Sequence, residues 1–379
     1  MKRLLYISNV SGKNMSYSFA GSAIEAAKSL GLEFYTAANR SKAPLEERQA
    51  DEEKYGIKLL HFDLSRSPFS LQNVKAYRQL CDIIRENKID FIHCNTPVGG
   101  LLGRLAGKKC KVKKVIYQAH GFHFYKGAPL LNWLLYYPVE KWLARYTDVL
   151  ITINQEDYEL AKKTMNAKQV TYIPGVGIDV DIYHNVDVDV KAKKAELNLQ
   201  DDDVVLISMG ELIKRKNYEV AIKAIAKTGN KKIQYIICGR GPELESLQAL
   251  AEELGVSKQV HFLGFRKDVR ELLKVADVFL FTSLQEGLPR ALMEAMASGL
   301  PCVVSKIRGN IDLIEDGKNG YLCLPTDVDA FTYAIQKMVQ KPIFRSEAGN
   351  KNFEKVKGFD FSVAEKSISN IYAEVFAEQ

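Results

Sequence analysis

The sequence predicts an α/β fold made of two doubly wound domains, each with a parallel sheet covered by helices on both faces. Short apolar, β-branched segments alternate with segments of helical period, the alternation stops once, and then it restarts. Near-continuous apolar strands are typical of parallel sheets that are buried on both faces. A chain of 379 residues is also long enough for two separate cores.

The first run of alternating segments covers the N-terminal half. Its expected strands are at 3–8, 58–62, 90–94, 114–119 and 148–153, with helix-period segments at 22–31 and 73–87. Residues 172–186, "YIPGVGIDVDIYHNV", are rich in Pro, Gly and Asp and have no period, so we expect a hinge there.

The second run follows the hinge. Its expected strands are at 204–210, 232–239, 259–264, 277–283 and 301–305, with a helix at 241–255 and a terminal helix at 360–376. Ligands of doubly wound sheets bind at the carboxyl ends of the strands, so we expect two facing domains with a cleft between them.

Composition and charge limit the class of protein. Apolar residues make up 46% and charged residues 26%, and the six cysteines are scattered, which predicts reduced thiols in a cytosolic protein without disulfides or structural zinc. We expect neither a signal peptide nor a membrane span. The net charge is +8 over residues 1–183 and −1 over the rest, and six cations lie in residues 104–114. Such a cluster can meet phosphates or can simply be a solvated loop.

Residues 283–305, "SLQEGLPRALMEAMASGLPCVVS", predict an anion site where a strand passes into a helix. Pro289 suits the first turn of that helix, and the backbone amides around Gly287 and Leu288 are donors near its positive end. Glu286 can accept hydrogen bonds from a bound hydroxyl. Glu294 lies among apolar neighbours, where a ribose diol would pair it. The alternative is that Glu294 is a surface glutamate and Glu286 only a partner of the helix dipole.

This stretch resembles the E-x7-E region of the family 4 retaining glycosyltransferases, which have the GT-B architecture of two facing Rossmann-like domains. The resemblance implies an acceptor-binding domain at 1–180, a nucleotide-sugar-binding domain at 181–358, and a helix at 359–379 that packs back on the first domain. "GELIKRKN" at 210–217 resembles the loop that grips the donor diphosphate. There Glu211 stands where the family more often has Arg.

Two further loops resemble those that line the nucleotide pocket of this family. They are "ICGRGPE" at 237–243 and "FLGFRKDV" at 262–269, the latter beside the base. The donor-binding residues implied by all these motifs are Gly210, Glu211, Gly239, Arg240, Gly241, Phe265, Arg266, Gly287, Leu288, Pro289 and Glu294.

Residues 119–154 resemble the capsular and exopolysaccharide branch of the family. The resemblance implies that His120 contacts the transferring sugar or its phosphate. His123 and Lys126 follow in the same loop and could meet an acceptor phosphate, although His123 could also be a packed loop histidine. Ser11 and Gly12 lie in a loop after the first strand that suits donor or acceptor contact.

Residues 130–146, "LLNWLLYYPVEKWLARY", combine leucines with Trp, Tyr and two cations. A buried helix that covers the sheet is the leading interpretation of the leucines. Trp and Tyr beside cations also suit a membrane interface, where anionic lipid attracts each near-surface cation by about 1 kcal/mol. We therefore expect a cytoplasmic protein that is peripheral at the inner face of the cell membrane.

The resemblance implies transfer of a sugar, with retention, from a nucleotide diphosphate sugar to a polyprenyl-diphosphate-linked saccharide in capsule or exopolysaccharide synthesis. The donor implied is of the UDP-N-acetylhexosamine type, with no metal or other cofactor and no nucleic acid as partner. Arg215 and Lys216 would stabilise the leaving diphosphate, Glu286 would orient sugar hydroxyls, and His120 completes the implied catalytic set. The alternatives are a GT-B nucleotide-sugar epimerase and a non-catalytic nucleotide-sugar-binding partner.

Three other patterns carry no prediction of function. "QDDDVV" at 200–205 lies at the start of a strand, the wrong end for a metal ligand set. "GRLAGKKC" lacks the spacing of a P-loop and its Ser or Thr. "GVGIDV" lacks the third glycine of a dinucleotide-binding motif, and the sequence predicts no helix after it.

Overall fold

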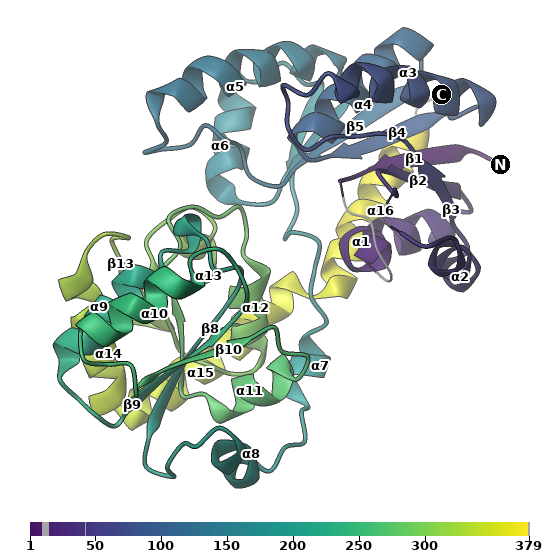
Figure 1. The fold of residues 1–379 in the computed structure, drawn as a ribbon. Coiled ribbons are helices and arrows are strands. Elements are labelled where there is room, and N and C mark those ends of the chain that lie inside the picture. Colours follow the sequence, from purple (N-terminus) through teal and green to yellow (C-terminus); the bar gives the residue numbers. More distant parts are fainter. Residues whose placement is uncertain (10–14, 42, 378–379) are drawn as a thin grey trace. The chain divides into compact units, whose positions relative to one another are not determined.

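The computed structural model describes residues 1–9, 15–41 and 43–377, and this part of the chain forms two compact units (Figure 1). Unit 1 is Met1–Gly177 together with Phe361–Gln379, and unit 2 is Ile178–Asp360. The chain therefore passes between the units twice, after Gly177 and after Asp360.

Unit 1 contains a seven-stranded parallel sheet in the order β3-β2-β1-β4-β5-β6-β7. Its strands are β1 (Arg3–Ile7), β2 (Glu33–Ala38), β3 (Lys58–His61), β4 (Phe91–Asn95), β5 (Lys114–Ala119), β6 (Val149–Thr152) and β7 (Gln169–Tyr172). Its helices are α1 (Met15–Ser29), α2 (Leu45–Tyr55), α3 (Gln72–Glu86), α4 (Pro97–Cys110), α5 (Leu130–Leu143), the 3-10 turn η1 (Ala144–Tyr146), α6 (Gln155–Thr164) and α16 (Phe361–Ala377).

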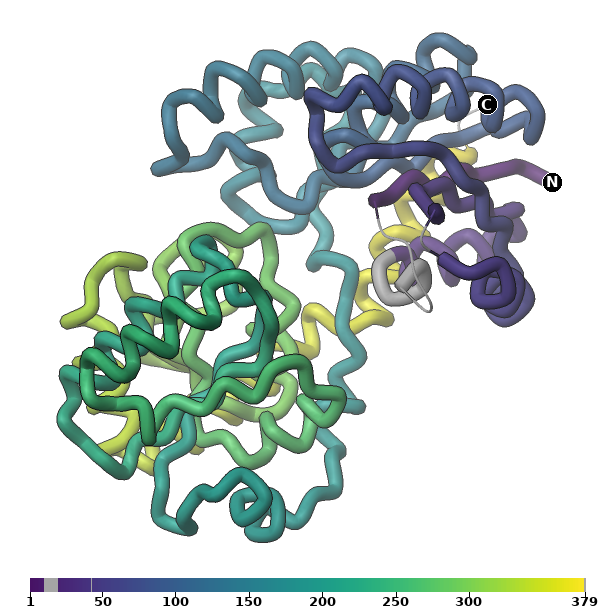
Figure 2. Tube along the Cα trace, viewed as in Figure 1, coloured from purple at the N-terminus to yellow at the C-terminus, as the bar shows by residue number. Residues whose placement is uncertain are grey.

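The C-terminal helix α16 belongs to unit 1 although its neighbours in sequence belong to unit 2 (Figure 2). It packs beside α1, and the ring of Phe376 lies 4.2 Å from that of Phe91 on β4. The hydroxyl of Tyr372 is hydrogen-bonded to Nδ1 of His93, also on β4, at 2.7 Å. Strands β1 and β4 therefore have helices on both faces, because residues Leu5 and Ile92 face a second cluster with α3 and α4.

Unit 2 contains a six-stranded parallel sheet in the order β10-β9-β8-β11-β12-β13. Its strands are β8 (Val204–Met209), β9 (Ile233–Cys238), β10 (Val260–Gly264), β11 (Val278–Phe281), β12 (Cys302–Ser305) and β13 (Gly320–Cys323). Its helices are α7 (Val180–His184), α8 (Val190–Glu196), the 3-10 turn η2 (Lys214–Lys216), α9 (Tyr218–Thr228), α10 (Leu244–Glu253), α11 (Val269–Val275), α12 (Arg290–Ala297), α13 (Asn310–Leu313), α14 (Val328–Gln340), α15 (Pro342–Val356) and the 3-10 turn η3 (Lys357–Phe359).

Two hydrophobic clusters cover the two faces of this second sheet. Successive strand residues point to opposite faces, so Val205 and Ile207 pack against α11, α12 and α15, while Leu206 packs against α9, α10 and α14. The apolar runs of the sequence arise from this double burial, and the predicted fold of two parallel-sheet domains is confirmed.

The sequence interpretation missed some elements. It does not predict β2, β7 and β13, and two of these, β7 and β13, are edge strands with part of their surface exposed. It also predicts no helix after "GVGIDV", which is wrong, because the short helix α7 begins at Val180 with Asp179 as its N-cap. An Asp that accepts from the amide three residues on is a helix-start signal that was available. Within the described chain, no helix has both the length and the apolar character to cross a membrane.

Candidate active site

Three charged groups meet at the carboxyl end of the unit 2 sheet. The Glu286 Oε1 atom accepts hydrogen bonds from Lys216 Nζ at 2.7 Å and from Arg215 Nη1 at 2.8 Å. The side chains of Glu286 and Lys216 are only 11% and 12% exposed, so this contact is partly shielded from water. Two cations on one carboxylate leave a net positive charge, which suits an anionic ligand.

The fold brings these residues together by joining the loop after β8 to the loop after β11. Asn217 adopts a left-handed conformation (φ 56°, ψ 41°), and its Nδ2 donates to the carbonyls of Thr282 at 3.1 Å and Pro325 at 2.8 Å. The Thr282 hydroxyl donates back to Asn217 O at 2.9 Å. Asn tolerates this conformation better than most residues, so "KRKN" encodes a turn that presents its last two cations to Glu286.

The loop of residues 286–289 leads directly into α12. Pro289 is the N-cap residue and the helix begins at Arg290, one residue later than the sequence predicts. The first amides of a helix have no partner within it, so this end of α12 presents donors. Arg308 Nε donates to Glu286 O at 3.2 Å, and a Cβ on Gly309 (φ 79°) would lie 2.2 Å from Gly287 O, so Gly309 allows the close approach that supports the loop.

Glu294 lies on α12 and is 17% exposed at its side chain. It pairs with Arg290 one turn earlier, Nε to Oε1, at 3.5 Å. It is also hydrogen-bonded to the hydroxyl of Tyr183 on α7; burial, followed by the charge of Glu294, raises the pKa of that hydroxyl well above its usual range. Glu294 is therefore an oriented, half-buried carboxylate and not an exposed surface glutamate.

Three predicted donor-binding glycines are held in tight backbone packing. Gly210 has a φ of 146°, and a Cβ there would lie 3.2 Å from Cε of Lys216. A Cβ on Gly239 would lie 1.8 Å from Gly210 O, and one on Gly241 would lie 2.3 Å from Leu212 O. These glycines are needed for the close contact of the loops after β8 and β9, whatever they do for a ligand.

The remaining residues predicted for the donor differ in their surroundings. Phe265 is 66% exposed, and Arg240 and Glu211 are also exposed. Arg266 instead donates from Nε to Asp268 at 2.7 Å and from Nη2 to Glu196 of α8 at 2.9 Å. Arg266 thus links α8 to the loop before α11.

In unit 1, His120 lies immediately after β5, and its Nε2 is 2.9 Å from Oδ1 of Asn95 at the end of β4. Burial lowers the pKa of His120 to about 4, so the ring is neutral at pH 7. A neutral imidazole suits hydrogen bonding to a sugar better than charge neutralisation of a phosphate.

The residues predicted to bind the acceptor are Ser11, Gly12, His123 and Lys126, and the structure describes two of them. His123 stands 4.7 Å, centroid to centroid, from the ring of Tyr136 on α5. The side chain of Lys126 is exposed, and its amide donates to Glu156 at 2.8 Å. Ser11 and Gly12 lie outside the described residues.

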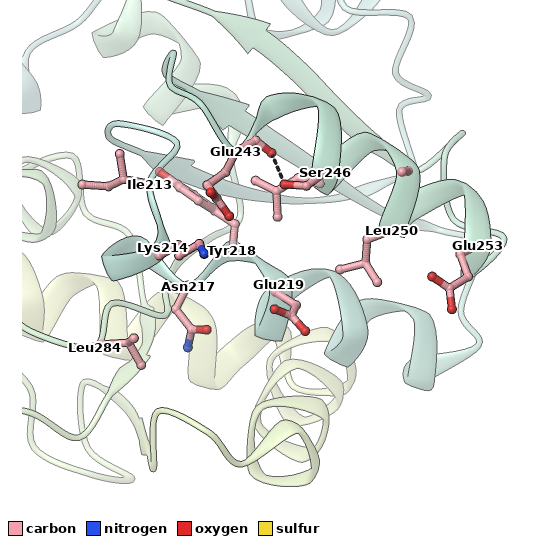
Figure 3. A pocket seen from close by; sticks show the side chains of 12 residues that line it. Ile213, Lys214, Asn217, Tyr218, Glu219, Glu243, Ser246, Leu250, Glu253 and Leu284 are labelled. Carbon is pink, nitrogen blue, oxygen red and sulfur yellow. Dashed lines mark hydrogen bonds between the residues drawn. The ribbon is translucent and has the colours of Figure 1, made fainter.

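A cavity of about 650 Å³ lies beside this site, between η2, α9 and α10 (Figure 3). Its lining includes Lys214, Tyr218, Glu243 and Leu284, but none of the predicted donor-binding residues. In Figure 3 the Ser246 hydroxyl donates to Glu243 O, at 2.8 Å. The cavity therefore neighbours the charged loop and is not itself the strand-end site.

Helix α5 has an unexpected orientation, and the prediction that its leucines are buried is wrong. Leu143 is its one buried residue, whereas Leu130, Leu131 and Leu134 are 73%, 62% and 65% exposed. The inward face instead carries aromatic residues and Glu140, whose Oε2 lies 2.9 Å from Nη1 of the buried Arg104. Arg104 is thus part of the interior and not of the basic surface cluster predicted at 104–114.

Several residues of these sites were not singled out from the sequence. They are Asn95, Tyr183, Asn217, Tyr218 and Arg308. Only Asn217 had a local signal, as an Asn at the end of a basic turn before a helix. Among the described residues, no group of three or more His, Cys, Asp or Glu side chains is arranged to hold a metal ion.

Comparisons with known proteins agree with this architecture. Two family models match: "Glycosyl transferase 4-like" over residues 36–154 and "Glycosyl transferases group 1" over residues 189–355. EpsD of Bacillus subtilis (strain 168), which carries a glycosyltransferase name, is 38% identical over 353 residues, covering 91% of this chain and 90% of its own. A UDP-Gal:α-D-GlcNAc-diphosphoundecaprenol α-1,3-galactosyltransferase of Escherichia coli is 28% identical over 321 residues, 82% of each chain.

Solved structures give the fold class. The crystal structure of HepE from Anabaena in complex with UDP has a TM-score of 0.79 and 21% identity, and covers 100% of both chains. A sucrose-phosphate synthase from Thermosynechococcus elongatus has the same TM-score at 18% identity. Two Rossmann-like domains, each with a parallel sheet, have the GT-B architecture. The chain belongs to the family 4 glycosyltransferases.

Proposed function

We propose that this glycosyltransferase moves a sugar from a UDP-sugar, of the N-acetylhexosamine type, to a polyprenyl-diphosphate-linked saccharide in capsule or exopolysaccharide synthesis, with retention at the anomeric carbon. The observation that carries the proposal is the Glu286 carboxylate bound by both Lys216 and Arg215 at the start of α12. The Escherichia coli relative supports a UDP-sugar donor and a lipid-linked acceptor, because its name states UDP-Gal and α-D-GlcNAc-diphosphoundecaprenol. The N-acetylhexosamine type is proposed from the resemblance to the exopolysaccharide branch.

In this proposal each group of the site has one task. Lys216 and Arg215 neutralise charge on the departing diphosphate, and the amides at the start of α12 add oriented donors. Within the described chain Oε1 of Glu286 takes both cation contacts, so Oε2 serves the sugar hydroxyls. Glu294, oriented by Tyr183, binds the ribose diol.

The test uses two neighbouring lysines of the same turn. Lys216→Ala should lower kcat on the order of 100-fold, the scale of a lost transition-state charge contact. Lys214→Ala is the matched control, because Lys214 is exposed and its contacts do not include Glu286. UDP release and product formation are measured with UDP-sugars and a short polyprenyl-diphosphate-linked saccharide. A Lys216→Ala enzyme as active as the control would remove Lys216 from the site.

The same assay separates the alternatives. A nucleotide-sugar epimerase converts the donor without an acceptor, and a non-catalytic partner shifts the melting temperature with UDP-sugar but releases no UDP. Retention is tested by the anomeric configuration of the product. Full activity after dialysis against EDTA is expected, because the proposed charge stabilisation comes from Arg215, Lys216 and the α12 amides.

We further propose that α5 docks the enzyme on an anionic membrane surface, where a polyprenyl-linked acceptor resides. Its outward face carries exposed Leu130, Leu131, Leu134 and Trp142. Lys141 and Arg145 are exposed at or just after the C-terminal end of this helix. The lysines at the end of α4 lie nearby, because Nζ of Lys108 stacks on the ring of Tyr146. Apolar side chains beside cations match the interface of an anionic bilayer.

Vesicle sedimentation tests this surface. The protein should bind vesicles that contain phosphatidylglycerol more strongly than phosphatidylcholine vesicles, and salt should weaken the binding. Leu131→Ser combined with Leu134→Ser should reduce binding, whereas Leu45→Ser, which changes a leucine on α2 that is 61% exposed, should not. Equal binding by the two variants would contradict docking through α5.

A further inference from the structure

We propose that Asn95 is a positioning residue that holds His120 as a neutral ring with its hydrogen on Nε2. The contact joins the ends of adjacent strands: Asn95 is the last residue of β4 and His120 follows β5. The effect of this contact on turnover rests on the proposed role of His120 in sugar transfer, whereas the state of the ring does not.

The orientation of the Asn95 amide identifies the donor in this hydrogen bond. Asn95 Nδ2 donates to Ile7 O on β1 at 3.3 Å, which directs Oδ1 toward His120 Nε2 at 2.9 Å. An amide oxygen only accepts, so Nε2 must carry the hydrogen. The buried Tyr6 hydroxyl is also hydrogen-bonded to the Asn95 side chain, which further restricts the amide.

Burial makes the neutral ring the stable form. The pKa of His120 is lowered to about 4, so one nitrogen carries a hydrogen at pH 7 and the other carries a lone pair. With Nε2 protonated, Nδ1 is the acceptor. A ring in this state accepts a hydrogen bond from a sugar hydroxyl and does not neutralise a phosphate, so the neutral state favours the sugar over the phosphate among the two contacts that the family resemblance implies.

The backbone next to Asn95 supports a fixed position. Thr96 has φ 65° and ψ 158°, a conformation that is almost restricted to glycine and is strained for other residues. Its hydroxyl donates to Asn95 O, and Pro97 starts α4 directly afterwards. The surrounding structure thus holds the end of β4 in a strained conformation, which keeps the Asn95 side chain in one place.

The test reads the ring directly by NMR of the full-length protein labelled with 15N-histidine. Comparison with His120→Gln identifies the His120 signals. The wild type should show a neutral His120 protonated at Nε2. Asn95→Asp keeps an oxygen at the same position and should keep the hydrogen on Nε2, whereas Asn95→Leu should lose this preference. Asn73→Leu is the control, because it removes a buried amide on α3 that binds Ser65 and Ser67 instead.

Turnover gives the second measurement. Asn95→Leu should lower kcat about tenfold, the scale of one lost hydrogen bond, with a smaller change in the KM for the donor. If Asn95→Leu does not fold, as judged by circular dichroism, Asn95→Ser replaces it, because its hydroxyl is too short to reach Nε2. A hydrogen on Nδ1 in the wild type, or an unchanged ring in the folded variant, would overturn the inference. Control of the ring by Asn95 without any sugar transfer would instead contradict the proposed function alone.

Discussion

Glu286 shows how a single residue acquires its role through partners distant in the sequence. Lys216, which is 70 residues away, and Arg215 both bind its Oε1, and Lys216 Nζ also lies 4.7 Å from the centre of the Phe281 ring. The charge of the carboxylate keeps both cations at the strand ends before any ligand arrives. A site that is already oriented in this way loses less free energy in ordering when a charged ligand binds.

The donor affinity should depend on Glu294 and, to a smaller degree, on Tyr183. Glu294→Ala should weaken UDP-sugar binding by roughly 1–3 kcal/mol, because a charged hydrogen bond is lost. Tyr183→Phe should weaken it by about 0.5–1.5 kcal/mol, because the carboxylate loses the group that orients it. Isothermal titration calorimetry measures both, with Glu252→Ala on the exposed face of α10 as the control. Unchanged affinity in Glu294→Ala would disprove the ribose contact.

Stability should fall as the pH is lowered from about 6.5 to about 4. Burial lowers the pKa of His120 from 6.5 to about 4 and that of His93 to about 3. In this pH window the two histidines are protonated in the unfolded chain but stay neutral in the folded chain, so protonation favours unfolding. The melting temperature, measured across this range, should decrease less steeply in His120→Gln than in the wild type. Parallel curves for the two proteins would exclude His120 as a contributor.

In helix α5 the aromatic residues and Glu140, rather than most of the leucines, form the face that packs inward. Trp133, Tyr137 and Glu140 share one face, and this face packs against the rest of unit 1. The buried Arg104 lies 3.8 Å from the centre of the Tyr117 ring while it pairs with Glu140. An ionic and aromatic contact therefore anchors the helix, and all of its leucines except Leu143 remain exposed.

Glu140→Gln should destabilise unit 1 by about 3–5 kcal/mol, because Arg104 would remain buried without a carboxylate. Arg104 is 1% exposed at its side chain and cannot recover its hydration without moving. Chemical denaturation, followed by the fluorescence of Trp133 and Trp142, measures the loss. Glu159→Gln on α6 breaks an exposed pair with Lys163 and should change stability by less than about 1 kcal/mol. Similar losses for both variants would show that the buried pair contributes little.

At the scale of the whole molecule, unit 1 is closed by a segment from the other end of the chain. Helix α16 fills one face of the unit 1 sheet with Ile368, Tyr372 and Phe376, and Lys2 Nζ donates to Phe376 O at 2.6 Å. Unit 1 therefore completes its core only after unit 2 has been synthesised. Where the chain leaves unit 1, Gly177 packs directly against Phe361, where the chain re-enters it. A Cβ on Gly177 would lie 2.6 Å from Cα of Phe361, so there is no room for a side chain.

Gly177→Ala should lower the melting temperature of unit 1 more than Gly127→Ala does. Both glycines have positive φ, 78° and 90°, but a Cβ on Gly127 would meet nothing within 4 Å. Both variants therefore carry the backbone penalty of roughly 1–2 kcal/mol, and only Gly177→Ala adds a clash with backbone. Differential scanning calorimetry separates the two effects. Equal decreases would show that the contact with Phe361 is easily relieved.

The sequence by itself determined the class of fold, the positions of most strands along the chain and the residues of the strand-end loops in unit 2. Hydrophobic period, helix-start signals and the E-x7-E motif are local, so they can be seen in residues that are close together in the chain. The edge strands β7 and β13 were not predicted, because a half-exposed strand has a weak apolar signal in the sequence.

Only the tertiary structure decided which of these residues meet. Parallel strand pairing places Asn95 beside His120, and the joined loops after β8 and β11 place Lys216 beside Glu286. The burial of Arg104 with Glu140, and with it the outward face of α5, also depends on packing between helices that the amphipathic period does not specify. Contacts between distant residues depend on strand register and on the choice of one helix face over another, and both are set by the packing of the whole core.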